Sequence, residues 1–212
     1  MCARGNSENA ELVSELHHRF KNNLQLLVSL CRLQADRTAN PEVLRALQHM
    51  QNRVRAISYI HERLQRIEGC SLIDAGEYLK NLLRELQSSY DVTSRVALQL
   101  SLADMALDTE QALSLGLLSN ELLSNSFEHA FPGNRKGTIS AQLRYAAEGN
   151  SETGELEIKD DGVGLPREVD FWRDESLGFH LVRILATQLR ADVHVESVYG
   201  TLFLITFPLS ED

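Results

Sequence analysis

The first third of the sequence follows one helical period over two long segments, and this pattern constrains the fold more than any other feature. Apolar side chains recur every three or four residues over residues 9–38, which is typical of an amphipathic helix. Asn40 and Pro41 then provide an N-cap and a first helical residue for a second amphipathic helix that reaches about Ile67. Each helix is apolar on one stripe only, so an antiparallel hairpin leaves apolar surface to be covered. We therefore expect a homodimer in which two hairpins form a four-helix bundle.

A change of pattern near Ser71 indicates a second structural unit that contains both helices and strands. Asp74 is placed to cap a helix, and Asp108-Thr109 begins another. The helices and strands do not alternate strictly, which predicts a layered α/β sandwich with a mixed sheet. We place a helical domain over residues 9–70 and the sandwich over residues 71–212, so the expected fold class is α+β. The expected elements of the second domain are helices over 75–87, 109–130 and 177–189, strands over 95–102, 138–145, 155–160, 193–198 and 202–207, and a polar turn over 148–154.

Composition and net charge exclude several classes of protein. Hydrophobic residues make up 43% of the 212 residues and charged residues 24%, which excludes a disordered chain and a bundle of membrane spans. The net charge of −9 is too acidic for general nucleic-acid binding, which requires a basic surface. The N-terminus lacks the apolar core of a signal peptide, and the three cysteines are scattered as free thiols would be. We therefore expect a cytoplasmic protein with no membrane span and no nucleic-acid partner.

His18 on the first helix is a candidate nucleophile. At about 100° per residue, it lies about 200° from Leu16 and Phe20, opposite the apolar stripe. An unperturbed imidazole has a pKa of about 6.5, so at neutral pH a ring nitrogen carries a lone pair that can attack an electrophile. Asn22 lies four residues further on the same face and can orient the ring or a water. The alternative is that His18 is simply a solvated surface side chain.

A polar stripe interrupts the leucines of the helix predicted over residues 109–130. Glu121, Asn125 and then Glu128 or His129 follow at helical spacing and share one face. Carboxylate and amide oxygens are the ligands that Mg²⁺ prefers, alongside waters and substrate phosphates. The stripe is therefore a candidate cation site, and the alternative is a helix edge that faces solvent.

Three further short motifs point to a bound nucleotide. Asp160 follows a predicted strand, and Gly162 and Gly164 after it let the backbone approach a ligand closely. A carboxylate at this place can accept a hydrogen bond from an exocyclic amine such as that of adenine. Gly178 lies at the start of a predicted helix, where backbone N–H groups favour phosphate, and Thr201 offers a hydroxyl near the end of the chain. Each of these motifs is common when it occurs alone.

The ordered set of motifs resembles the N, G1 and G2 boxes and the closing Gly-Thr of the GHKL ATPase superfamily. The segment His18-Arg19-Phe20-Lys21-Asn22 resembles the phosphoacceptor box of a histidine-kinase subfamily that reads His-Arg-x-Lys-Asn. The resemblance covers about residues 10–208, and the chain is therefore similar to the catalytic core of a sensor histidine kinase. It implies a two-helix antiparallel dimerisation and phosphoacceptor hairpin followed by a Bergerat-type α/β sandwich that binds ATP.

The same resemblance implies a role for each motif residue. His18 accepts the phosphoryl group, Glu121 polarises a water or the histidine, and Asn125 holds a Mg²⁺ ion that bridges the ATP phosphates. Asp160 binds the adenine amine, and Thr201 closes the adenine side. The supporting residues of the phosphoacceptor box are Arg19, Lys21 and Asn22. The residues that bind ATP are Asn125, His129, Asp160, Gly162, Gly164, Gly178 and Thr201.

The function implied is that of a histidine kinase in a two-component system, with transfer of the phosphoryl group to an aspartate of a response-regulator receiver domain. The input signal then comes from a separate sensor protein or from a longer parent chain. An alternative is a histidine phosphotransfer or adaptor protein with a degenerate ATP domain, because Glu128 stands where relatives commonly carry Lys or Arg. A third alternative is a protein-serine kinase of the anti-sigma type, which shares the ATP-binding fold.

Overall fold

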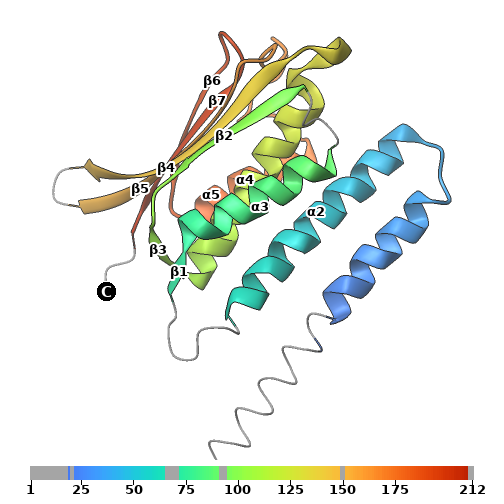
Figure 1. Cartoon of the computed structure of the whole chain (residues 1–212). Coiled ribbons are helices and arrows are strands. Elements are labelled where there is room, and N and C mark those ends of the chain that lie inside the picture. Colours follow the sequence, from blue (N-terminus) through green and yellow to red (C-terminus); the bar gives the residue numbers. More distant parts are fainter. Residues whose placement is uncertain (1–18, 20–21, 65–71, 91–94, 149–150, 210–212) are drawn as a thin grey trace, which may run out of the picture. The chain divides into compact units, whose positions relative to one another are not determined.

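The chain divides into two compact units, Met1–Ser71 and Leu72–Asp212 (Figure 1). A computed structural model describes residues 19, 22–64, 72–90, 95–148 and 151–209. Among these residues, no helix combines the length and the apolar character that crossing a membrane requires.

The first unit is a helical hairpin within the residues described. Its first helix runs over residues 22–35, and the predicted beginning of this helix lies mostly outside the described residues. The second helix, α2, runs over Pro41–Leu64. The predicted cap at Asn40 is confirmed, because its Oδ1 accepts the Glu42 N–H at 2.9 Å and its carbonyl accepts the Leu44 N–H at 3.0 Å.

Apolar side chains of the first helix lie on more than one face. Leu24 and Cys31, two members of the predicted stripe, are buried. Leu27, which belongs to the same predicted stripe, is exposed together with other leucines of this helix. The exposed leucines are Leu26, Leu27, Leu30 and Leu33.

The second unit is built on a mixed sheet, as predicted. The order of its described strands is β2 (Val96–Leu102), β4 (Gly137–Glu148), β5 (Ser151–Asp160), β7 (Leu202–Pro208) and β6 (Asp192–Glu196). The β2–β4 pair is parallel, and all other neighbours in this sheet are antiparallel.

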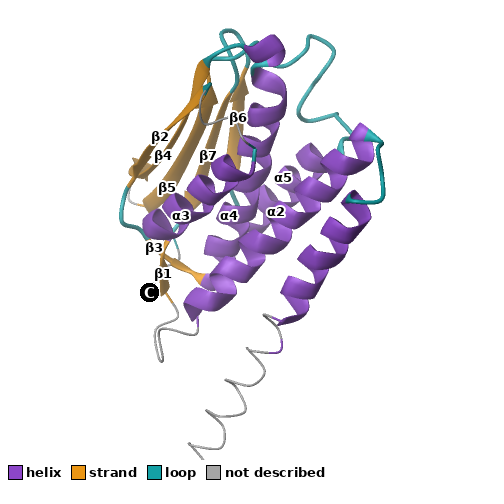
Figure 2. Ribbon diagram, turned by 45° about the vertical axis from the view of Figure 1, so that its right-hand side comes forward, coloured by secondary structure: helices purple, strands orange, loops and turns teal. Residues whose placement is uncertain are grey.

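Three helices cover one face of this sheet (Figures 1 and 2). They are α3 (Ala75–Ser89), α4 (Thr109–Asn125) and α5 (Leu177–Gln188). Asp74 caps α3 by accepting the N–H groups of its first turn, and Asp108 caps α4 by accepting the Gln111 N–H at 2.8 Å. The predicted cap at Asp74 and the predicted start of a helix at Asp108-Thr109 are therefore confirmed. Alternate strand residues form the core with the helices, among them Ile139, Ala141, Leu143, Leu156, Ile158, Ile205 and Phe207.

Two features of the second unit differ from the prediction. The expected polar turn over 148–154 is wrong for residues 151–154, which lie in β5. Gly154 is paired with Phe207 on β7, and a Cβ on this glycine would lie 2.4 Å from the ring, so the glycine serves close packing rather than a turn. In addition, α4 ends at Asn125 and continues as a π-helical turn, η1 (Ser126–Ala130), instead of one α-helix.

A small antiparallel ladder was not predicted. It joins β1 (Leu72–Asp74) to β3 (Ala106–Asp108). Both strands precede a helix, and their last residues, Asp74 and Asp108, are the two helix caps. The ladder therefore sets α3 and α4 side by side at their N-terminal ends. Strands this short carry little periodic signal in the sequence.

Candidate nucleotide-binding site

Asp160 is the centre of a hydrogen-bonded cluster at the end of β5. The residue is only 2% exposed, and its Oδ1 accepts the N–H groups of Gly162 at 2.9 Å and Thr201 at 3.1 Å. Its Oδ2 accepts the Ser126 hydroxyl at 3.1 Å. A carboxylate has about four lone-pair positions, so Oδ2 keeps room for one more donor. We call Asp160, Gly162, Thr201 and Ser126 the β5 cluster.

Glycines let the chain fold tightly around Asp160. A Cβ on Gly162 would lie 2.4 Å from the carbonyl oxygen of Ala130, and one on Gly200 would lie 1.9 Å from the carbonyl oxygen of Asp160. Gly200 and Gly164 also have positive φ angles, 83° and 77°, which other residues adopt at a cost. Glycine at 162 thus allows a close backbone approach, as predicted. Glycine at 164 instead allows an unusual backbone conformation.

A second cluster joins α4 to the start of α5. A Cβ on Gly178 would lie 3.7 Å from Oδ1 of Asn125 and 3.7 Å from Oε2 of Glu121. Glu121 has no exposed surface, and its Oε1 accepts the side-chain amide of Asn120 at 3.3 Å. The start of α5 favours negative charge, because the helix dipole points its positive end there. We call Glu121, Asn125 and Gly178 the α4–α5 cluster.

The two clusters meet at consecutive residues. Asn125 is the last residue of α4, and Ser126 is the first residue of η1. The structure therefore brings the predicted polar residues of α4 together with the predicted glycine of α5, and it brings the predicted Asp160 together with Thr201. No role was predicted for Ser126, because its hydroxyl follows Asn125 in a stretch that already contains several other polar side chains.

A further serine supports the glycine loop. The Ser197 hydroxyl accepts the Leu165 N–H at 2.7 Å, one residue after Gly164. This bond ties the loop to the β6–β7 turn that carries Gly200. No motif in the sequence signalled this serine, because the contact joins segments about thirty residues apart.

The predicted polar stripe does not continue past Asn125. The His129 side chain is 68% exposed, and its Nε2 lies 3.9 Å from Oε2 of Glu128. Glu128 is 12% exposed, and its Oε1 accepts the hydroxyl of Tyr90, which also stacks on Phe127. The π-helical geometry of η1 changes the direction in which these side chains point. The Glu128 carboxylate is thereby held by Tyr90 at the C-terminal end of α3.

The phosphoacceptor box lies at the edge of the described residues. His18 and Lys21 lie outside them, while Arg19 and Asn22 are exposed. No described group of three or more His, Cys, Asp or Glu side chains could hold a metal ion. The oxygens of Glu121 and Asn125 are of the type that Mg²⁺ takes, so a Mg²⁺ at this place would draw its other ligands from water and phosphate.

The comparison with known families defines the class of the second unit. Residues 110–211 match the family described as "Histidine kinase-, DNA gyrase B-, and HSP90-like ATPase". Residues 15–90 match a second family, described as "Histidine kinase". The chain belongs to the histidine kinases and carries their ATP-binding domain.

Individual relatives agree with this assignment. The chain is 32% identical over 177 residues to "Sensor histidine kinase PdtaS" of Mycobacterium tuberculosis (strain ATCC 25618 / H37Rv). This match covers 82% of this chain and 34% of PdtaS. It is 28% identical over 207 residues to "Blue-light-activated histidine kinase 2" of Erythrobacter litoralis (strain HTCC2594), covering 94% of this chain and 57% of that protein. The chain thus spans about a third of the length of PdtaS.

Solved structures share the fold. The histidine kinase domain from Erythrobacter litoralis EL346 blue-light activated histidine kinase superposes with a TM-score of 0.70 at 24% identity, covering 96% of each chain. The EL346 protein itself superposes with a TM-score of 0.66 at 26% identity, covering 94% of this chain and 63% of EL346. The predicted α+β fold, a helical hairpin followed by an ATP-binding α/β sandwich, is confirmed.

Proposed function

We propose that the protein phosphorylates His18 with MgATP and then passes the phosphoryl group to an aspartate of a response-regulator receiver domain. The observation that carries this proposal is the meeting of two clusters at Asn125 and Ser126, one suited to a base and one suited to phosphate. Residues 9–70 serve as the dimerisation and phosphotransfer domain in this proposal, and residues 71–212 bind ATP.

The β5 cluster binds adenine. The free lone-pair position on Oδ2 of Asp160 accepts the exocyclic amine, and the donors from Gly162, Thr201 and Ser126 keep the carboxylate in place. Gly164 shapes the loop beside the base through its positive φ. This arrangement supports base recognition because the carboxylate is fixed before the ligand arrives, which reduces the entropy lost on binding.

The α4–α5 cluster binds the phosphates. Residues 73–212 contain 23 acidic and 11 basic residues, so overall charge does not attract an anion to this unit. Phosphate binding therefore depends on the N-terminus of α5, at Gly178, and on Asn125 as the ligand of Mg²⁺. The Mg²⁺ ion neutralises phosphate charge when it is bound. His129 has an exposed side chain, and we assign it to ATP binding as a residue outside the α4–α5 cluster.

The chemical step transfers one phosphoryl group. A ring nitrogen of His18 forms a bond to the γ-phosphorus while the bond from this phosphorus to the β,γ-bridging oxygen breaks, and ADP leaves. Glu121 polarises a water or the histidine in this proposal. Arg19 and Lys21 stabilise the phosphate or dock the acidic face of the receiver, and Asn22 orients the ring. In the second step, an aspartate oxygen of the receiver attacks the same phosphorus and His18 is regenerated.

The partners follow from the same proposal. The exposed leucines of the first helix, such as Leu26, Leu30 and Leu33, are apolar surface that a second hairpin would bury in a homodimer. A separate sensor protein or a longer parent chain supplies the signal, and the reaction takes place in the cytoplasm.

Labelling with γ-³²P-ATP and Mg²⁺ tests the proposal. We expect acid-labile label on the wild-type protein, no label on His18→Ala, and wild-type label on the matched control His17→Ala. Label that persists in His18→Ala assigns the phosphate to another residue and overturns the proposal. Label that moves to a receiver domain on mixing, with loss from this protein, supports the second step.

A phosphotransfer or adaptor protein is the second candidate, and Glu128 in place of a basic residue favours it. The structure weakens this objection to ATP binding, because the Tyr90 hydroxyl donates to the Glu128 carboxylate, whose side chain is only 12% exposed. Calorimetry with a non-hydrolysable ATP analogue separates the two candidates. Absence of binding, with phosphoryl relay from another kinase intact, selects the adaptor.

A further inference from the structure

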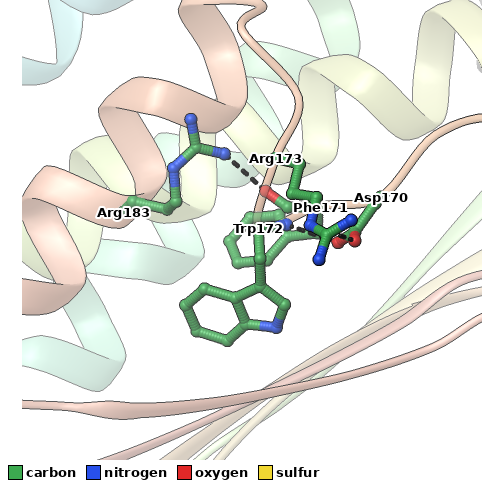
Figure 3. Close-up of polar contacts among 5 residues, drawn as sticks. All are labelled: Asp170, Phe171, Trp172, Arg173 and Arg183. Carbon is green, nitrogen blue, oxygen red and sulfur yellow. Dashed lines mark hydrogen bonds and ion pairs between the residues drawn. The ribbon is translucent and has the colours of Figure 1, made fainter.

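An arginine on α5 holds the connection between β5 and α5, residues 161–176. The Arg183 guanidinium donates through Nη1 to the carbonyl oxygen of Phe171 and through Nη2 to the carbonyl oxygen of Asp174 at 2.7 Å. Figure 3 shows the guanidinium directed at the Phe171 carbonyl, with the Trp172 indole turned away from it. The guanidinium also lies 5.8 Å from the centre of the Phe171 ring. One side chain thus contacts this connection at two carbonyls and at an aromatic face.

The segment that Arg183 holds is a compact turn. The Asp170 carbonyl accepts the N–H groups of Arg173 at 3.0 Å and Asp174 at 2.8 Å. The Asp170 side chain accepts the Trp172 N–H at 2.9 Å. Hydrogen bonds from the Ser176 side chain and backbone lower the pKa of Asp174, and the charge of Arg183 acts in the same direction. The turn is therefore well defined. The bonds named in this paragraph join residues within 170–176, whereas the two hydrogen bonds from Arg183 join the turn to α5.

Phe171 anchors the turn in the core beside both clusters. The ring is buried and makes edge-to-face contacts with Phe179 and Phe203, each at a centroid distance of 5.3 Å. Phe179 follows Gly178 of the α4–α5 cluster, and Phe203 lies two residues after Thr201 of the β5 cluster. The turn is thus attached to the elements that carry both clusters. Phe171 alone cannot fix the orientation of the backbone around it, because a ring contact leaves rotation of the segment possible.

We propose that Arg183 is a positioning residue that fixes the turn over residues 170–174 and thereby presets the β5–α5 connection as a lid over the nucleotide. The planar guanidinium can donate to two carbonyl oxygens at once, which a lysine ammonium on a flexible stem does not reproduce. The lid is ordered before nucleotide binds, so binding does not have to order it. The lid role rests on the proposed nucleotide site, whereas the anchoring of the turn by Arg183 does not.

Trypsin digestion of the full chain without nucleotide tests the anchoring. Arg173 lies in the turn with an exposed side chain, so cleavage after Arg173 reports opening of the turn. Loss of the two charged hydrogen bonds in Arg183→Met is expected to raise the cleavage rate after Arg173 about tenfold or more. Cleavage after Arg173 in Arg183→Lys is expected to be at least about threefold faster than in wild type, because lysine keeps the charge but lacks the paired N–H donors of the guanidinium. The control Arg144→Met removes a strand arginine that pairs with Glu155, and it is expected to be cleaved at the wild-type rate.

A second readout does not depend on protease. Trp172 is the only tryptophan in the sequence and is 59% exposed, so its fluorescence anisotropy reports motion of the turn without interference. We expect lower anisotropy in Arg183→Met than in wild type and in Arg144→Met, with far-UV circular dichroism unchanged in all three. Wild-type cleavage and wild-type anisotropy in Arg183→Met overturn the proposal. Wild-type behaviour of Arg183→Lys in both assays also overturns it, because charge alone then suffices.

Kinetics test the lid role separately. We expect the KM for MgATP to rise about tenfold in Arg183→Met while kcat changes less than about twofold, because positioning of the lid affects binding and not the transfer itself. A tenfold fall in kcat with an unchanged KM overturns the lid role. If the wild-type protein shows no labelling with ATP, the proposed function fails, and the digestion and anisotropy of the nucleotide-free protein still decide whether Arg183 anchors the turn.

Discussion

The β5 cluster and the α4–α5 cluster bind opposite ends of one ligand in our proposal, and they are built differently. In the β5 cluster, three donors from the protein already hold the Asp160 carboxylate. In the α4–α5 cluster, two oxygen-bearing side chains lie around the open face of Gly178. On this proposal the first cluster recognises a flat base through one remaining hydrogen bond, while the second depends on charge that arrives with the ligand. Variants that affect one cluster and leave the other unchanged can test this difference.

The largest effect is expected for Asp160→Asn. An amide at this position presents N–H donors where two backbone N–H groups and one hydroxyl need an acceptor, and a buried unsatisfied donor costs about 1–3 kcal/mol. We expect the Kd for adenosine and for MgATP to rise together by about 100-fold, which corresponds to about 2.7 kcal/mol. Isothermal titration calorimetry with both ligands measures the change.

Asp161→Asn is the matched control for that variant. Asp161 is adjacent and exposed, and its carboxylate accepts the Thr138 N–H at 2.8 Å, outside the β5 cluster. We expect near wild-type affinity for both ligands. Equal losses in Asp160→Asn and Asp161→Asn would contradict the assignment of Asp160 to the base.

A smaller and more selective effect is expected for Gly178→Ala. The added methyl group meets Asn125 and Glu121 at 3.7 Å, an ordinary contact distance, so the domain folds. Alanine is also about 1 kcal/mol better than glycine within a helix, so the melting temperature does not fall. The methyl group fills the space proposed for phosphate and Mg²⁺, and we expect about a tenfold weaker Kd for MgATP, or about 1.4 kcal/mol, with adenosine affinity unchanged. Weaker adenosine binding, measured by the same titration, would show that the two clusters do not act separately.

The smallest effect is expected for Glu128→Gln. The Tyr90 hydroxyl donates to the Glu128 carboxylate, and a glutamine carbonyl can accept the same bond. We expect the Kd for MgATP to change by less than about twofold, the size of a weak surface charge effect. Glu85→Gln, an exposed residue of α3 outside both clusters and outside the β5–α5 connection, is the control for the change in net charge. An affinity gain of tenfold in Glu128→Gln alone would place the carboxylate against the phosphates.

Local features of the fold could be predicted from the sequence. The caps at Asn40, Asp74 and Asp108 need only a short side chain before an apolar helix, so their signal is local. The mixed sheet followed from alternating strands joined without strict αβ order. Asp160 and Gly178 were also predicted as site residues, because a strand end and a helix start are visible in the sequence.

Features that depend on distant contacts could not be predicted. Gly154 suggested a turn, but it is a strand residue because Phe207 packs over it. Ser126 donates a hydrogen bond to Asp160, and Arg183 donates one to the Phe171 carbonyl. Each bond joins two segments that come together only when the chain folds. The π-helical turn η1 changes the direction of the side chains after Asn125, and His129 is therefore separated from the stripe of Glu121 and Asn125. The spacing of residues in the sequence does not predict a π-helical turn.

The β5–β7 pairing has a consequence for the folding equilibrium. Asp160 on β5 donates its N–H to the carbonyl of Thr201 at 2.9 Å and accepts the Thr201 N–H through Oδ1, across 41 residues of chain. A ligand that needs both residues in place binds the folded unit and not the unfolded chain. At a free concentration 100 times its Kd, such a ligand adds about 2.7 kcal/mol to the free energy of unfolding. If the proposed nucleotide is that ligand, a lower nucleotide concentration leaves more of this unit unfolded.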